Sequence, residues 1–166
     1  MTRNRKISRT ALLVTIAVLL GYVENLFPPP VPVPGIKIGL ANAVVILLLY
    51  TKQVKEAFCV SFMKVFLCTL LFGTPVSFLY SLSGAVLSLC IMLLAKKTSL
   101  FSLIGVSGLG GISHNLAQLV CAFFFVGKGA LLYIPVLCIS GAVCGVLTGF
   151  ATQIILKRGR GLFDKE

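Results

Sequence analysis

Charged residues are scarce in this 166-residue chain, where they make up 11% of the sequence. Ordinary soluble domains carry about 25%. Acids are the scarcest: there are four, and the one aspartate, Asp164, lies in the C-terminal tail. Hydrophobic residues make up 58% of the chain. This composition excludes an ordinary soluble domain.

The missing acids also exclude several kinds of enzyme. Holding magnesium against a diphosphate requires clustered carboxylates, and the sequence has none. It also lacks HExxH, GxSxG and P-loop motifs. We therefore expect no enzymatic activity, no ATP hydrolysis and no cofactor.

Histidine and paired cysteines are lacking too. One histidine and no CxxC pair make a structural zinc site improbable. Six cysteines lie inside apolar runs, where they are expected to pack as small apolar side chains. They are Cys59, Cys68, Cys90, Cys121, Cys138 and Cys144.

Long apolar runs fill most of the sequence, and the mean hydropathy is +1.05. Crossing a bilayer takes about 20 mostly apolar residues. The pattern predicts an all-α, polytopic membrane protein, with one integral membrane domain over residues 1–166 and six transmembrane helices. The predicted spans are 10–26, 35–50, 54–72, 75–95, 100–126 and 130–156. The basic N-terminus lacks a small-residue cleavage site, so the first span is predicted to be retained.

Basic residues lie at the ends of the apolar runs and give a net charge of +11. The predicted spans place twelve of them on one side of the membrane, against Lys128 and, near its edge, Lys37 on the other. Basic loops stay in the cytoplasm, so both termini are predicted to be cytoplasmic. Nucleic-acid binding is not expected, because the chain offers no soluble basic face. The twelve are Arg3, Arg5, Lys6, Arg9, Lys52, Lys55, Lys96, Lys97, Lys157, Arg158, Arg160 and Lys165.

Small residues recur at four-residue spacing, which lets membrane helices approach closely. Gly141, Gly145 and Gly149 form a GxxxGxxxG pattern, and Ser77, Ser81 and Ala85 form a second series. The glycine-rich stretch over 105–111 indicates either close packing or a helix break.

Several polar side chains fall in the middle or outer half of the predicted spans. Ionisable groups at such depth usually face a bundle interior or a wet cavity. We predict an outward-facing substrate-binding pocket formed by Glu24, Lys37, Asn42, Lys64, His114, Asn115 and Gln118. Structural alternatives are that Lys37 reaches the interface, that Glu24 pairs with a lysine, and that Asn42 and Asn115 join helices. Two lysines and a histidine against one glutamate favour an anionic or zwitterionic solute.

Five of the seven prolines lie between Glu24 and Lys37. A proline-rich segment is semi-rigid and loses little entropy when it becomes ordered. It is predicted either to close over the pocket mouth or to act as a rigid spacer between the first two spans.

Several stretches together carry a family resemblance: "GYVENLFP", "PGIKIGLANAVVILLLY", "KVFLCTLLFG", "SFLYSLSGAVLSL", "GVSGLGGISHNLAQL" and "PVLCISGAVCGVLTG". They resemble the bacterial Gx transporter family, also called heptaprenyl diphosphate synthase component I. That family is similar to the substrate-binding (S) components of energy-coupling factor (ECF) transporters. The resemblance implies a bacterial cell-membrane protein of six helices with an outward-facing pocket and a lid between the first two.

The resemblance also implies partners: a transmembrane scaffold and ATPase subunits. S components usually dock through an AxxxA pattern on the first span. Here the candidates are Ala11, Ala17 and Gly21, whose spacing departs from that pattern. The expected function is a substrate-binding subunit of an importer. The alternative is a non-catalytic membrane subunit associated with heptaprenyl diphosphate or menaquinone biosynthesis.

Overall fold

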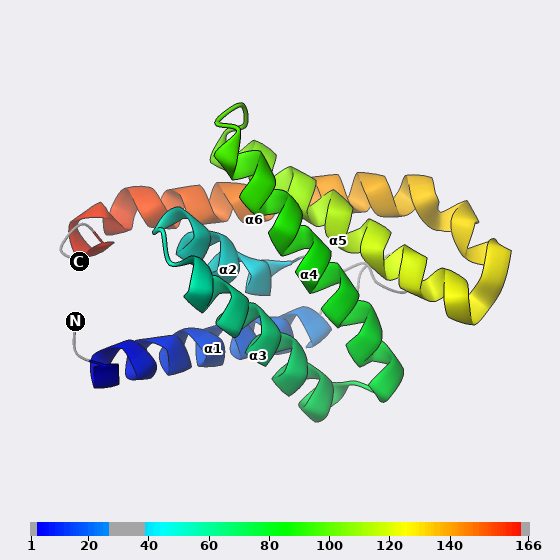
Figure 1. Ribbon diagram of the computed structural model, residues 1–166, viewed down its shortest axis with the longest axis horizontal. Helices are drawn as coiled ribbons and strands as arrows, with labels where there is room; N and C mark the ends of the chain where they lie inside the picture. The colour runs from blue at the N-terminus through cyan, green and yellow to red at the C-terminus, as the bar shows by residue number, and fades with distance from the viewer. Residues whose placement is uncertain (1–2, 27–38, 164–166) are drawn as a thin grey trace.

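A computed structural model describes residues 3–26 and 39–163 and contains only helices within them (Figure 1). The all-α prediction is therefore confirmed for the described part of the chain. The elements are α1 (Arg3–Leu26), α2 (Leu40–Tyr50), α3 (Val54–Phe72), α4 (Pro75–Lys97), α5 (Leu103–Val126), the 3-10 helix η1 (Gly127–Tyr133) and α6 (Ile134–Phe163).

Local sequence signals explain several helix ends. Thr74 and Ser77 form a reciprocal capping box at the start of α4, and Pro75 follows as its first residue. The Ser102 side chain accepts a hydrogen bond of 3.2 Å from the Gly105 amide at the start of α5. Gly127, at a φ of 76°, ends α5 in a conformation that favours glycine.

Four helical stretches are long and apolar enough to cross a membrane: Arg3–Leu26, Pro75–Lys97, Leu103–Phe125 and Gly127–Gly159. Large apolar side chains also cover the outer surface; Leu70, Phe124 and Leu132 are 70%, 80% and 82% exposed. Such a surface suits lipid better than water. These features support a helical membrane protein.

Two predicted spans differ most from the observed helices in where they start. Helix α1 begins at Arg3, seven residues before the predicted start, because hydropathy marks the apolar segment and not the helix end. The span predicted over 35–50 is helical only from Leu40 in the described residues, because Gly39 has a left-handed φ of 83°. Helix α2 has 11 residues and is about 16 Å long, which is short for a membrane span. Helix α3 has 19 residues, but three of them are charged: Lys55, Glu56 and Lys64. Six spans therefore remain a prediction.

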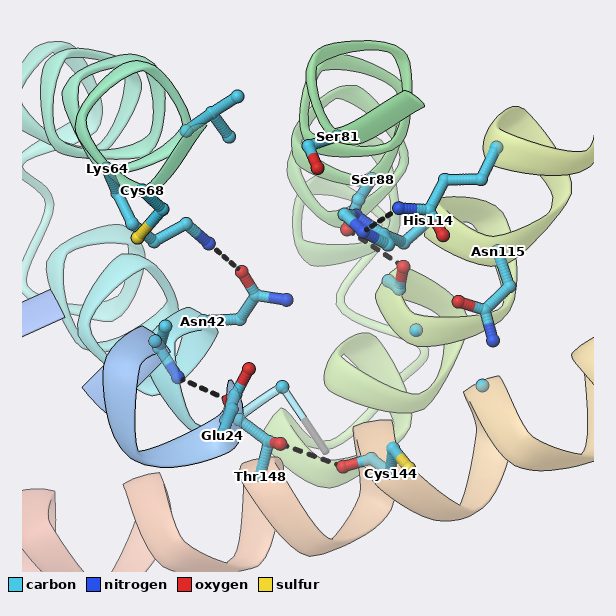
Figure 2. A pocket seen from close by; sticks show the side chains of 18 of the residues that line it. Glu24, Asn42, Lys64, Cys68, Ser81, Ser88, His114, Asn115, Cys144 and Thr148 are labelled. Atoms are coloured by element: carbon cyan, nitrogen blue, oxygen red, sulfur yellow. Dashed lines mark hydrogen bonds between the residues drawn. The ribbon is translucent and has the colours of Figure 1, made fainter. Parts of the chain in front are cut away.

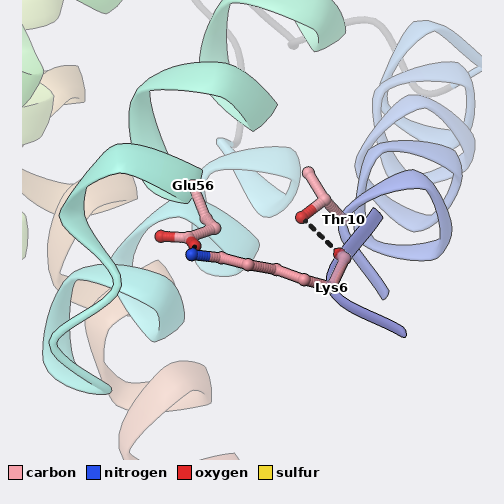
Figure 3. A network of polar contacts seen from close by, with 3 residues as sticks. All are labelled: Lys6, Thr10 and Glu56. Carbon is pink, nitrogen blue, oxygen red and sulfur yellow. Dashed lines mark hydrogen bonds and ion pairs between the residues drawn. The ribbon is translucent and has the colours of Figure 1, made fainter. Parts of the chain in front are cut away.

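One end of the bundle gathers the basic segments. Lys6 on α1 forms a 2.6 Å ion pair with Glu56 on α3 (Figure 3). The Lys96 ammonium donates to the Leu49 carbonyl and lies over the Tyr50 ring, which brings the C-terminal ends of α4 and α2 together. Both termini of the described chain lie at this end in Figure 1. We call it the basic end.

Helices α5 and α6 pack backbone to backbone through glycine. A Cβ added at Gly111 would lie 2.1 Å from the Gly141 carbonyl oxygen, and one at Gly145 would lie 2.5 Å from the Ser107 carbonyl oxygen. Ser107 also donates a 2.5 Å hydrogen bond to the Gly145 carbonyl. The GxxxGxxxG pattern is thus used for close packing, and 105–111 stays helical.

The predicted docking residues on α1 differ in exposure. Ala17 is fully buried, in a core that includes Val45, Leu48 and Val60. Gly21 also faces inward, since a Cβ there would lie 3.0 Å from Sγ of Cys68. The burial of Ala17 argues against docking at that position, whereas Gly21 is partly exposed and its role in docking stays a prediction. Ala11 is exposed, and its role stays a prediction.

Candidate functional site

A cavity of about 300 Å³ lies at the centre of the bundle, and all six α-helices contribute to its lining (Figure 2). Pockets for small molecules begin at about this size. The lining extends from Met92 and Ser107 in the interior to Phe72 and Thr74 at the α3–α4 turn. Phe72 and Thr74 are exposed, so the cavity reaches the surface away from the basic end.

Helices α1, α2 and α3 supply the charged side of the cavity. Lys64 is 8% exposed, and its Nζ donates a 2.5 Å hydrogen bond to Oδ1 of Asn42. Oε1 of Glu24 accepts a 3.0 Å hydrogen bond from the Ala41 amide, at the start of α2. Figure 2 shows Glu24, Asn42 and Lys64 together on one side of the space. A buried ammonium group suits an anionic or acceptor group on a ligand.

Helices α4 and α5 supply the opposite side, where His114, Ser81 and Ser88 lie in Figure 2, and they add no Lys, Arg, Asp or Glu to the lining. Nε2 of His114 lies 3.2 Å from Nε2 of Gln118, one helical turn further along α5. Ser88 donates a 2.8 Å hydrogen bond to the Gly110 carbonyl and so joins α4 to α5. The two sides of the cavity thus differ in chemistry.

Asn115 borders the cavity, but its side-chain amide group is hydrogen-bonded to α6. Its Nδ2 donates to the Leu137 carbonyl at 2.9 Å and to Oγ of Ser140 at 3.3 Å, both on α6. These contacts favour the alternative that Asn115 joins helices. Its side chain is therefore the least available of the predicted binding residues.

Comparison with known families agrees with this architecture. The family model of heptaprenyl diphosphate synthase component I matches residues 13–155. The chain belongs to the heptaprenyl diphosphate synthase component I family. No curated protein and no solved structure matches the chain. Every residue that lines the cavity, from Gly21 to Thr148, falls within the matched range.

In this member of the heptaprenyl diphosphate synthase component I family, six of the seven predicted substrate-binding residues line the same cavity. These are Glu24, Asn42, Lys64, His114, Asn115 and Gln118. Lys37 and the proline segment lie outside the described residues. The structure brings the six together, and their role in binding a substrate stays a prediction.

Other lining residues were not predicted as part of the site. Ser81 belongs to the small-residue series on α4, which was interpreted only as a packing signal. Cys68, Cys144 and Thr148 also line the cavity, and none has a sequence signal that separates it from an ordinary helix residue. Among the described residues, no group of three or more His, Cys, Asp or Glu side chains is placed to hold a metal ion.

Proposed function

We propose that this protein is the substrate-binding membrane subunit of an ECF-type importer, which captures a small anionic or zwitterionic solute from outside the cell. The buried Lys64 ammonium in a cavity of about 300 Å³ is the observation that carries the proposal. A charge at such depth is costly in a membrane protein. A ligand that supplies an anionic group would offset part of that cost.

The proposed topology has six crossings, with both termini in the cytoplasm at the basic end and the cavity open to the outside. Basic residues favour the cytoplasmic side of a membrane. The described members of the basic set lie near the termini, whereas the cavity reaches the surface at Phe72 and Thr74. A solute arriving from outside would then reach Lys64 without crossing the apolar half of the bundle.

Release of the solute into the cytoplasm requires energy from partners. Only one carboxylate, Glu24, lines the cavity, so the described residues offer no second carboxylate there for a proton relay. We therefore propose a transmembrane scaffold and ATPase subunits as partners. The proposed role of this chain is binding and not catalysis.

Native mass spectrometry of the purified protein tests the proposal. We expect a small solute to co-purify with the wild type and to be lost from Lys64→Met. Lys128→Met is the matched control, because Lys128 is exposed in η1 and does not line the cavity. The proposal is contradicted if no solute is bound, or if Lys64→Met retains it as well as the control does.

The family description favours a second candidate, a non-catalytic membrane subunit of heptaprenyl diphosphate or menaquinone biosynthesis. In that role the chain would raise the activity of a soluble prenyl synthase subunit, and the cavity would be dispensable. Prenyl synthase assays with and without this chain separate the candidates. Stimulation that Lys64→Met leaves intact supports the biosynthetic role.

A further inference from the structure

A close contact with α4 fixes the orientation of His114. A Cβ added at Gly84 would lie 2.8 Å from Cε1 and 2.9 Å from both Nδ1 and Nε2 of the His114 ring. Nearly equal distances to three ring atoms mean that the ring presents its face to Gly84. Any larger residue at position 84 would displace the ring, so the absence of a side chain there allows His114 to lie flat against α4.

The fixed ring in turn holds Gln118. Nε2 of His114 and Nε2 of Gln118 are 3.2 Å apart and lie one turn apart on α5. Gln118 is 6% exposed and lines the cavity. The contact with His114 is made by the amide nitrogen of Gln118.

The amide oxygen of Gln118 lacks a hydrogen-bond partner among the described residues. Oε1 of Gln118 is buried, and no described residue donates to it. Buried polar atoms are nearly always hydrogen-bonded, so an exception on a residue that lines a cavity needs an explanation. A carbonyl oxygen can only accept a hydrogen bond, so its partner must be an N–H or O–H donor.

We propose that His114 and Gln118 form a second recognition subsite, which takes a hydrogen-bond-donating group of the ligand. This inference rests on the proposed function and narrows its substrate class. The substrate carries an anionic or acceptor group for Lys64 and, separately, an N–H or O–H donor for Gln118. His114 acts as a positioning residue that holds the amide toward the cavity.

Three matched pairs of probes test the subsite: the 2-carboxylates, 2-acetates and 2-propionates of pyrrole and furan. Each pair keeps its shape and its carboxylate, but replaces a ring N–H donor with an oxygen. The three lengths sample different separations between Lys64 and Gln118. Affinities for the purified protein in detergent are measured by ligand-observed NMR titration.

We expect at least one pyrrole compound to bind about tenfold more tightly than its furan partner, as one hydrogen bond to a buried acceptor allows. Gln118→Leu should reduce that ratio to less than about twofold, whereas the matched variant Gln153→Leu should preserve it. Gln153 lies on α6 and does not line the cavity. Lys64→Met should weaken or abolish the binding of both members of the pair.

The ratio of pyrrole to furan affinity is measured on the wild-type protein, so it does not depend on the folding of any variant. If all three pairs bind with equal affinity through Lys64, the subsite is refuted and the proposed function stands. If Gln118→Leu retains the pyrrole preference, the assignment to Gln118 is refuted. If the wild type binds none of the six carboxylates, both the subsite and the proposed binding of an anionic solute are contradicted.

Discussion

Lys64 on α3 and Asn42 on α2 share a hydrogen bond of 2.5 Å between the ammonium group and the amide oxygen. The contact joins two helices and directs a buried cation toward the cavity. Asn42 is neutral, so this one contact by itself compensates only part of the free energy lost when the ammonium leaves water. If the site binds an anion as proposed, it does so with a charge that is costly to bury.

The stability of the empty protein should therefore rise when this pair is made apolar. We expect Lys64→Met combined with Asn42→Leu to raise the free energy of unfolding by about 1 kcal/mol and to abolish solute binding, because replacing buried polar partners by apolar residues is often stabilising. Thermal unfolding in detergent measures the first effect, and native mass spectrometry measures the second. A clear fall in melting temperature would show that the pair is mainly structural.

Packing of α5 on α6 should not tolerate a single methyl group. Gly111→Ala would place Cβ 2.1 Å from the Gly141 carbonyl oxygen and force the helices apart. Overpacking of this kind costs about 1–3 kcal/mol, so we expect a lower melting temperature. Gly129→Ala is the control, because its added Cβ would meet nothing within 4 Å. Equal melting of the two variants would argue against the observed glycine packing.

Substitutions on α1 should separate packing from docking. We expect Ala17→Trp to prevent stable folding, because Ala17 is fully buried. Ala11→Trp should leave the melting temperature unchanged, because Ala11 is exposed. Fluorescence-detected size-exclusion chromatography measures folding of both variants. A folded, solute-binding Ala17→Trp protein would return position 17 to the list of possible docking residues.

Orientation can be tested with single cysteines at positions 97 and 128. All six native cysteines lie in the described residues and form no disulfide, so a cysteine-free background requires no loss of a covalent link. Lys128→Cys should react with an impermeant thiol reagent on intact cells, and Lys97→Cys only after permeabilisation, following the positive-inside rule. Both side chains are exposed, so access is not limited by burial. Labelling of position 97 from outside would reverse the proposed topology.

Helix positions were the most predictable property of this chain. The span predicted over 54–72 coincides with α3, and the predicted start at residue 75 is the start of α4. Apolar runs and a proline at the first helical position are local signals, so these boundaries can be predicted without knowledge of tertiary contacts. The start of α2 was not predictable, because nothing in the sequence near Gly39 shows that this glycine has a left-handed φ.

The polar residues of the cavity could be grouped by depth alone, but their partners could not be assigned. Asn115 turns to α6 and Gln118 to His114, although they lie three positions apart on the same helix. The role of Gly84 depends on a neighbouring helix and leaves no trace in the local sequence. The same limit applies to Ala17: a small residue predicts a close neighbour but does not identify the helix to which that neighbour belongs.

The backbone contact between α5 and α6 also has a mechanical consequence. Carbonyl oxygens and Cα atoms meet directly at Gly111, Gly141 and Gly145, so no flexible side chain at these points can absorb a relative shift. The two helices should consequently move as one stiff body. If the protein takes up a solute as proposed, any change in the shape of the cavity is then left to α1, α2, α3 and α4, the other helices that line it.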